Sequence, residues 1–379
     1  MKIIHFSDTH LGYGEYAKVD ALSGINQREL DVYAAFKQAV NLILKKTPDL
    51  VIHAGDLFDS PRPNNRAIHI ALSELQRLSA KGIPTVIISG NHSTPRIAAS
   101  GSIFEALTIL PNIYPVYKKQ YEKIIISDAA VHIVPHTSSD TELAAELEKV
   151  KPDPQVKFNI LGLHAGLTWD NIYKMGEFSE LIIPGKILSR FKGFDYIALG
   201  HWHRFLPLKG IPNAYYSGSI ERFTFREEGY PKGVVFADLT KHTTEFIPLK
   251  VRGMIKLGPI NCAKKDASQI LDKINELKAQ NKIDGQIVHL KLENLTRATY
   301  IQLDLREIRA LLAEAFHLDI HPELVSESAS GSSTDAAIGA LPLEFERFLA
   351  NSDLPDNDKK ELTGLGMFYI NQAQEREQL

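Results

Sequence analysis

The stretch Leu50-Val51-Ile52-His53-Ala54-Gly55-Asp56-Leu57-Phe58-Asp59 decides how this chain folds. Its apolar beginning predicts a buried strand, and Gly55 allows the backbone a sharp turn where that strand ends. We therefore expect Asp56 at the carboxyl end of a central strand, which is where open α/β sheets place their ligands.

Metal-binding side chains follow four other apolar, strand-like runs in the same way. In chain order they are Asp8 with His10, Asn91 with His92, His164, and His201 with His203. Carboxylate and amide oxygens together with imidazoles suit two divalent ions of the manganese, iron or zinc kind, and a carboxylate can bridge both ions. Asp56 is the candidate for that bridge. The His-x-His spacing supports a site because an extended segment sends alternate side chains to one face.

Most histidines in proteins are structural, and we expect that role for those outside the pattern. The nine are His5, His53, His69, His132, His136, His242, His289, His317 and His321. Of these, His132 and His136 flank a predicted strand and Pro135, so they are expected nearest the site.

The composition limits the classes of function. A chain of 379 residues predicts two to three domains, and 43 basic against 46 acidic residues give no global positive field for nucleic acid or anionic membrane. Any DNA binding must therefore come from a local patch or a partner. Cys262 is the only cysteine, which excludes an internal disulfide and is typical of a reducing compartment. The first residues run straight into a strand without a leader, and no apolar run approaches about 20 residues. We expect a cytoplasmic protein with no membrane partner.

Hydrophobic periodicity predicts an α/β fold. Strands at 2–6, 50–53 and 85–88 alternate with helices at 28–45 and 66–80, and a second half repeats the pattern with strands at 158–163 and 196–199.

We expect four parts along the chain. They are a catalytic domain at 1–250, a small α/β cap at 251–325 with helices at 267–279 and 303–316, a Ser-, Ala- and Gly-rich linker at 326–340, and a helical segment at 341–379. The last segment carries an apolar face at Leu341, Phe345, Phe348 and Leu349, and so needs a surface to dock on.

The residues follow in order the pattern Asp-x-His, Gly-Asp, Gly-Asn-His, His and Gly-His-x-His. This pattern resembles the calcineurin-like metallophosphoesterase superfamily over residues 1 to about 240. The runs Ser7-Asp8-Thr9-His10-Leu11-Gly12 and Ser217-Gly218-Ser219-Ile220-Glu221-Arg222, followed by Glu227-Glu228 and Lys232-Gly233, are similar to the SbcD nuclease subunit, a homologue of the meiotic recombination eleven nuclease. The linker and terminal helices extend the similarity to the whole chain. The resemblance implies a two-layered α/β/β/α sandwich with a small α/β DNA-binding cap and C-terminal helices.

The resemblance also implies residue roles and two divalent ions, with Mn²⁺ expected. One ion would be held by Asp8, His10, Asp56 and His203, and the other by Asp56, Asn91, His164 and His201. His92 would face the scissile phosphate as the catalytic residue. The family has Asp where this chain has Ser93, so we expect an altered orientation of His92 and an altered rate rather than loss of activity.

The implied function is metal-dependent DNA hydrolysis, as an exonuclease or endonuclease subunit that processes DNA ends in double-strand-break repair. The implied partners are DNA ends, an SbcC-type coiled-coil ATPase on the terminal helices, and a second copy of the chain. Apolar residues for that homodimer are Ile68, Leu72, Ile103, Phe104 and Leu107. Candidates for contacts with DNA are Arg62, Arg66, Arg96, Tyr13 and Tyr16. Such arginines are more often simply solvated, whereas packing within the loop is as frequent for such tyrosines as contact with DNA.

Two alternatives remain open from the residues alone. A phosphatase or phosphodiesterase acting on a small molecule or a protein uses the same two metals. A non-catalytic scaffold would keep the ligands only for stability. A complete ligand set with His92 argues against the scaffold, and the cap with the terminal helices argues against a minimal phosphatase.

Overall fold

The computed structural model describes residues 1–94, 101–168 and 180–325, and in the C-terminal part residues 345, 348, 349, 359 and 362–367. The chain divides into two compact units, Met1–Val325 and Ser326–Leu379. Arg96, the predicted linker at 326–340 and Leu341 lie outside the described residues. No helix in the described part of the chain is long and apolar enough to cross a membrane.

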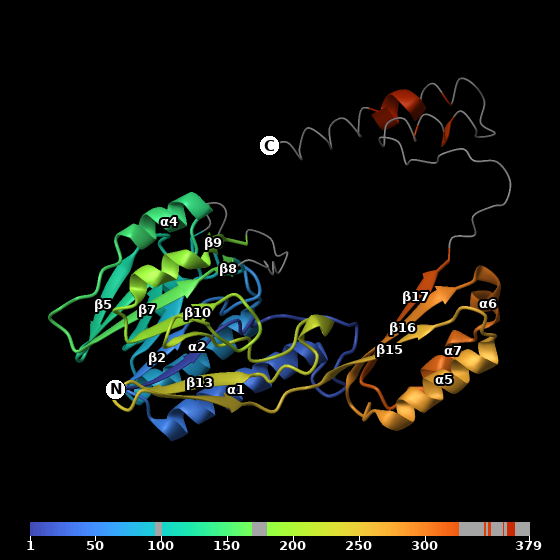
Figure 1. The fold of residues 1–379 in the computed structure, drawn as a ribbon, viewed down its shortest axis with the longest axis horizontal. Helices are drawn as coiled ribbons and strands as arrows, with labels where there is room; N and C mark the ends of the chain where they lie inside the picture. The colour runs from blue at the N-terminus through green and yellow to red at the C-terminus, as the bar shows by residue number, and fades with distance from the viewer. Residues whose placement is uncertain are drawn as a thin grey trace. The chain divides into compact units, whose positions relative to one another are not determined.

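Two six-stranded sheets form the larger part of the first unit (Figure 1). The first sheet has the order β14-β13-β1-β2-β3-β4, with β1 Lys2–Phe6, β2 Leu50–His53, β3 Thr85–Ile88, β4 Ile113–Val116, β13 Gly233–Asp238 and β14 Thr243–Pro248. The second has the order β11-β12-β10-β7-β6-β5, with β5 Glu122–Ile126, β6 Ala129–Val134, β7 Phe158–His164, β10 Tyr196–Gly200, β11 Leu206–Pro207 and β12 Ala214–Tyr216. β8 Gly166–Thr168 and β9 Ile182–Pro184 pair separately.

Local signals explain the helices that follow the first strands. α1 Gln27–Lys46 begins where the side chain of Asn26 accepts the N–H groups of Arg28 and Glu29, and ends at Thr47 in a left-handed conformation. α2 Asn65–Ala80 begins at Asn64 in the same way. Among the described residues, this part also contains the helices α3 Phe104–Leu107 and α4 Asp140–Glu148 and the 3₁₀ segments η2 Gly185–Phe191 and η3 Phe225–Glu227.

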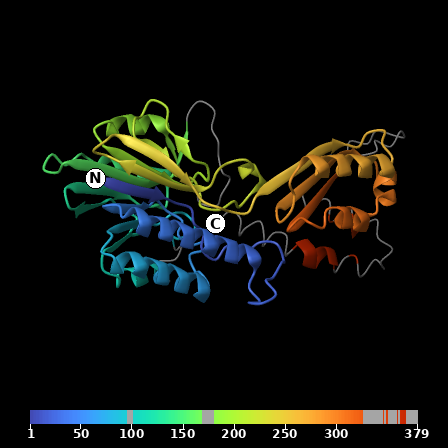
Figure 2. The same cartoon turned by 90° about the horizontal axis from the view of Figure 1, so that it is seen from below.

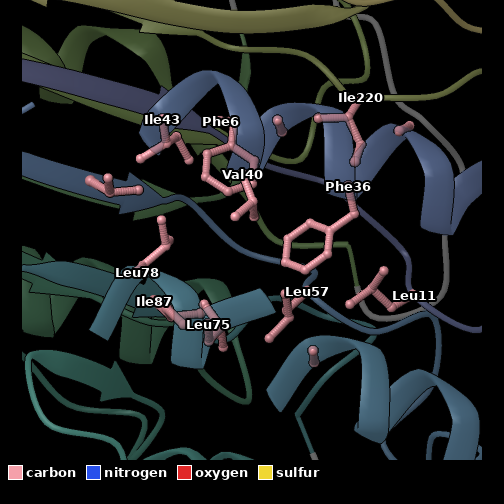
Figure 3. Close-up of a cluster of buried hydrophobic side chains, with 14 of the residues drawn as sticks. Phe6, Leu11, Phe36, Val40, Ile43, Leu57, Leu75, Leu78, Ile87 and Ile220 are labelled. Atoms are coloured by element: carbon pink, nitrogen blue, oxygen red, sulfur yellow. The ribbon is translucent and has the colours of Figure 1, made fainter. Parts of the chain in front are cut away.

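Three apolar clusters separate the layers. α1 and α2 pack on the outer face of the first sheet, where Phe36 and Val40 of α1 and Leu75 and Leu78 of α2 share one buried cluster with Phe6 (Figure 3). Ile52 and Ile88 of the first sheet meet Ile133 and Ile160 of the second between the sheets, and α4 with η2 covers the outer face of the second. The order of layers is helix, sheet, sheet, helix, which confirms the predicted α/β/β/α sandwich.

Residues 254–324 form a three-stranded parallel sheet, β15 Met254–Asn261, β16 Ile287–Leu295 and β17 His317–Leu324. One face of it packs on α5 Ala267–Gln280, α6 Arg297–Gln302 and α7 Leu305–Leu311 (Figures 1 and 2). The single helix predicted over 303–316 is wrong in its extent. Asp304 caps a new N-terminus by accepting the N–H of Arg306, and the helix ends at Leu311.

Two of the five apolar residues expected at a homodimer surface are core, and the other three, Ile68, Leu72 and Ile103, are half-buried. Phe104 and Leu107 are buried in the cluster under α1 and α2. Ile109, which lies two residues after the end of α3, is 73% exposed. In the C-terminal unit Leu349 is buried, Phe345 lies against Gly366, and Phe348 is exposed.

Candidate metal centre

The carboxyl ends of five strands bring the predicted site residues together. β1 leads to Asp8 and His10, β2 to Asp56, β3 to Asn91 and His92, and the adjacent strands β7 and β10 to His164, His201 and His203. The two carboxylates and all four histidines among the expected ligands are buried. Asp8, His10, Asp56 and His201 have positive φ angles of 52°, 46°, 51° and 101°. Non-glycine residues in this region store strain, which is common at functional sites.

Asp8, His10 and His203 form the first cluster whose ligand atoms could hold one ion. The Nε2 atoms of His10 and His203 are 3.3 Å apart. Each ring uses Nδ1 for a carboxylate, Asp59 at 3.1 Å and Glu227 at 3.2 Å respectively. Since Nδ1 donates in both rings, the two Nε2 lone pairs of the neutral rings face each other. A cation between them removes this conflict, and 3.3 Å suits two nitrogens that each bind an ion at about 2.1 Å.

Asp8, Asp56 and His164 form the second cluster. The Nδ1–H of His164 donates to the carbonyl of Ala54 at 2.8 Å, so the Nε2 lone pair of the neutral ring points the other way. It faces oxygens, Oδ2 of Asp56 at 3.0 Å and Oδ1 of Asn91 at 3.0 Å. Asp56 Oδ2 is buried without a hydrogen bond. His164 Nε2, Asp56 Oδ2 and Asn91 Oδ1 thus bring three lone pairs to one point. One nitrogen and two oxygens are ligands that suit a divalent metal ion, so these residues fit a metal site.

The electrostatics of the second cluster agree with this fit. Burial raises the pKa of Asp56, but the neighbouring His164, His92 and His10 outweigh it and hold this pKa well below its usual range. Burial lowers the pKa of His164, while Asp56 and Asp8 raise it to about 9. Without an ion, a proton on His164 Nε2 would satisfy the acceptors that face it, and a bound cation would take the place of that proton.

Three glycines give these side chains their room. A Cβ on Gly55 would lie 1.9 Å from His164 Nδ1, and one on Gly90 would lie 2.3 Å from Asp56 Oδ1. A Cβ on Gly200 would lie 1.9 Å from the carbonyl oxygen of Ala54. Gly55 also has a φ of +110°, which L side chains rarely adopt. The glycines next to the predicted ligands are therefore required by packing around the centre.

His201 is placed differently from the other expected ligands. Its main-chain N–H donates to both carboxylate oxygens of Asp8, at 3.1 and 3.2 Å, and its ring is 5.5 Å from that of His164. Its Nε2 is 3.0 Å from Glu180 Oε1. His201 is thus at the centre. It belongs neither to the two clusters above nor to the third that the described residues form, which is His10, Asp59 and His92.

His92 lies at the edge of the centre and is only half-buried. Its N–H donates to Asp56 Oδ1 at 2.9 Å, and its ring is 4.7 Å from that of His10. Its Nδ1 is 3.1 Å from the carbonyl oxygen of Asp59, which makes Nδ1 the donor and Nε2 the acceptor of the neutral ring.

The sequence matches the calcineurin-like phosphoesterases over residues 1–205. The chain belongs to the calcineurin-like phosphoesterase family. It is 30% identical over 316 residues to the DNA double-strand break repair protein Mre11 of Saccharolobus solfataricus, a match that covers 77% of this chain and 75% of the relative. It is 28% identical over 333 residues to the SbcD component of the nuclease SbcCD of Staphylococcus epidermidis, over 81% of this chain and 83% of the relative. The resemblance inferred from the motifs is therefore confirmed.

Sequence reasoning missed the carboxylates that surround the histidines of this phosphoesterase. They are Asp59 beside His10, Glu180 beside His201 and Glu227 beside His203. A carboxylate on the second nitrogen sets the tautomer and the orientation of a metal-binding imidazole. Asp59 and Glu227 stood inside the quoted motifs, but nothing in the local pattern connects them to a particular histidine.

The hydroxyl of Ser93, which stands where the family has Asp, is engaged by the main chain of Phe58. Its buried hydroxyl donates to the carbonyl of Phe58 at 3.3 Å and accepts the N–H of Phe58 at 3.4 Å. The contact with His92 Nδ1 comes from the main chain of Asp59. The Ser93 hydroxyl stabilises the loop that follows β2, because it donates one hydrogen bond to Phe58 and accepts another from it. A carboxylate at this position could only accept.

Several predicted neighbours of the site have structural partners. His132 is bonded to Tyr121 and to Asn159 of β7, and the N–H of His136 donates to the carbonyl of Ser89, which follows β3.

Three of the candidate DNA contacts, Arg66, Tyr16 and Tyr13, also have partners within the chain. Arg66 pairs with Glu29 at 3.0 Å. The ring of Tyr16 stacks on His317 of β17 with 4.0 Å between centroids. The hydroxyl of Tyr13 donates to the carbonyl of Phe223 at 3.2 Å and to Glu15. Packing accounts for these contacts of both tyrosines.

Proposed function

We propose that this phosphoesterase is a metal-dependent DNA nuclease that processes DNA ends in double-strand-break repair. The observation that carries the proposal is the pair of buried clusters that share Asp8, with histidine nitrogens and carboxylate oxygens directed at common points. The similarity to Mre11 and to SbcD over three quarters of the chain supports DNA as the substrate.

The proposed ligands are those expected from the motifs. Asp8, His10, Asp56 and His203 would hold one ion, and Asp56, Asn91, His164 and His201 would hold the other. Two divalent ions there, for which we propose Mn²⁺, would supply an activated water and neutralise charge on the phosphate. Asp59 and Glu227 orient the two imidazoles: each accepts the Nδ1–H of its histidine, so the Nε2 atoms of His10 and His203 point towards the proposed ion.

His92 is the proposed catalytic residue. It lies beside His10 with Nδ1 on the carbonyl of Asp59, so in the protonated ring the Nε2–H is the group that would hydrogen-bond a phosphate oxygen or give its proton to the leaving oxygen. An imidazole titrates near neutral pH, which suits such a proton transfer.

We propose the domain organisation and the partners on the same basis. Residues 1–250 form the nuclease domain, 251–325 a DNA-binding cap, 326–340 a linker, and 341–379 the segment that binds an SbcC-type ATPase. An exposed Phe348 supports docking of that segment on a partner. A homodimer is proposed through the surface around Ile109, since Phe104 and Leu107 are core.

The test compares a labelled DNA duplex with a generic phosphate ester, each with Mn²⁺, Mg²⁺ and Zn²⁺. We expect Mn²⁺-dependent cleavage of duplex ends that exceeds ester hydrolysis. Asp56→Ala should abolish cleavage and lower the metal content, because it removes a proposed ligand of both ions. Faster turnover of the ester would favour a phosphatase. Bound metal without hydrolysis of either substrate would favour a scaffold.

A further inference from the structure

One short turn touches both the candidate metal centre and the small domain of residues 254–324. It spans Thr224 to Glu228, includes η3, and follows the Ser217–Arg222 motif. Glu227 of this turn faces inward and is buried, whereas Phe225 and Glu228 are only half-buried and face the small domain.

Glu227 fixes the orientation of His203 from within the core. Its Oε1 accepts the Nδ1–H of His203 at 3.2 Å, and its Oε2 accepts the ammonium of buried Lys232. Lys232 also donates to the carbonyl of His203 at 2.6 Å and to Ser219 Oγ at 2.8 Å. Burial raises the pKa of Glu227, but Lys232 and His203 outweigh it and lower this pKa to about 2, so the carboxylate stays charged at neutral pH.

The other residues of the turn hold the small domain. Glu228 Oε1 accepts the main-chain N–H of Lys256 in β15 at 2.7 Å, and its Oε2 is 3.8 Å from the Lys256 ammonium. The ring of Phe225 lies 5.0 Å from that of His289 in β16. Both contacts reach strands of the small domain from residues close to Glu227 on either side.

The turn is held together as one piece. Thr224 and Glu227 form a capping box, in which the Glu227 carboxylate accepts the Thr224 N–H at 3.1 Å. The N–H of Phe223 donates to the same oxygen at 3.3 Å. A displacement of Phe225 or Glu228 therefore displaces the oxygen that orients His203.

We propose that Glu227 is a positioning residue for His203, and that the Thr224–Glu228 turn couples metal affinity at the centre to the contacts that β15 and β16 of the small domain make with this turn. The proposal rests on the proposed function only in taking His203 as a metal ligand. Coupling between two sites is reciprocal, so metal binding must in turn steady the strands that contact the turn.

The first test measures Mn²⁺ affinity of the full chain by titration calorimetry. Glu227→Gln should weaken binding of one ion about 10- to 100-fold, as is typical when the outer partner of a metal-binding histidine is lost. Glu228→Ala lies outside the centre and is half-exposed, so it should fold. The Glu228→Ala substitution should lower the affinity for the same Mn²⁺ ion by at least about 5-fold, which is the lower end of the coupling usually found between two sites. The matched control is Glu276→Ala, an exposed glutamate of α5 paired with Lys273, which should leave the affinity unchanged.

The second test needs no activity. Hydrogen exchange of the wild-type chain with and without Mn²⁺ should show slower exchange of β15 and β16 amides when the metal is present, and Glu228→Ala should remove that difference. The proposal is overturned if the Mn²⁺ affinity is unchanged in both turn variants. It is also overturned if the hydrogen-exchange rates of the β15 and β16 amides are the same with and without Mn²⁺. A chain that binds Mn²⁺ with this coupling but does not cleave DNA would refute only the proposed substrate.

Discussion

Replacing Gly90 with alanine places a methyl group inside the candidate metal centre. The new Cβ would lie 2.3 Å from Asp56 Oδ1 and 2.7 Å from His164 Nε2, where ordinary contact begins at 3.4 Å. The Asp56 oxygen must therefore retreat by about 1.1 Å and the His164 nitrogen by about 0.7 Å, or the backbone that carries Asn91 and His92 must shift by a similar amount.

Such shifts exceed what a metal site tolerates, since ligand distances vary by only about 0.2 Å. We expect the affinity for one Mn²⁺ to fall by at least about 100-fold, the upper end of the loss seen when only an outer partner of a ligand is removed. The bond from the His92 N–H to Asp56 Oδ1, 2.9 Å long, should break as well, and DNA cleavage should be lost with the metal.

Gly193→Ala is the matched control. Its Cβ would meet only Pro152 Cγ at 3.6 Å, and neither glycine has a positive φ. Calorimetric titration with Mn²⁺ and circular dichroism of the metal-free proteins separate loss of metal from loss of fold. A Gly90→Ala protein that binds two ions as tightly as Gly193→Ala would refute the assignment of Asp56 and His164 to the metal centre.

Four further outcomes are expected. His92→Ala should keep two metal ions and DNA affinity but slow single-turnover cleavage by about 10²- to 10⁴-fold, and loss of a metal would make His92 a ligand or a support. Removal of residues 336–379 should spare cleavage and abolish partner binding, whereas an unfolded catalytic unit would contradict this. Ile109→Asp should halve the mass in sedimentation if the protein is a dimer, and an unchanged dimer excludes that surface. Burial lowers the pKa of His5 to about 3 in the folded protein. As the pH falls from 6.5 towards 3, the unfolded chain therefore binds a proton on His5 that the folded protein does not bind. The free energy of unfolding should fall in that window by up to about 1.4 kcal/mol per pH unit. His5→Asn should reduce that slope, as followed by urea unfolding at several pH values, and an equal slope would contradict the shift.

Local signals in the sequence were enough for most elements. The helix expected at 28–45 is α1 Gln27–Lys46, because its apolar period and its cap at Asn26 are properties of neighbouring residues. The helix expected at 303–316 ended early, since Asp304 starts a new helix and the chain then turns into β17.

The candidate site divides in the same way. Each residue proposed as a ligand could be named from the sequence because each follows an apolar strand, and strand ends of an α/β sheet gather at one edge. Their roles stay predictions, since a histidine near a strand end can also be structural: His132 lies within β6 and is bonded to Tyr121 and Asn159.

The tertiary structure alone decided which groups complete each histidine. Glu227 lies 24 residues from His203, and Asp59 lies 49 residues from His10. No periodic pattern spans such separations, because the contact depends on how strands from two sheets are paired and how loops between them pack. The sequence by itself determined the strands, the sandwich and the residues that could bind metal. Only the folded chain decided which nitrogen of each imidazole points at the centre, since that is set by the acceptor that packing places on the other nitrogen.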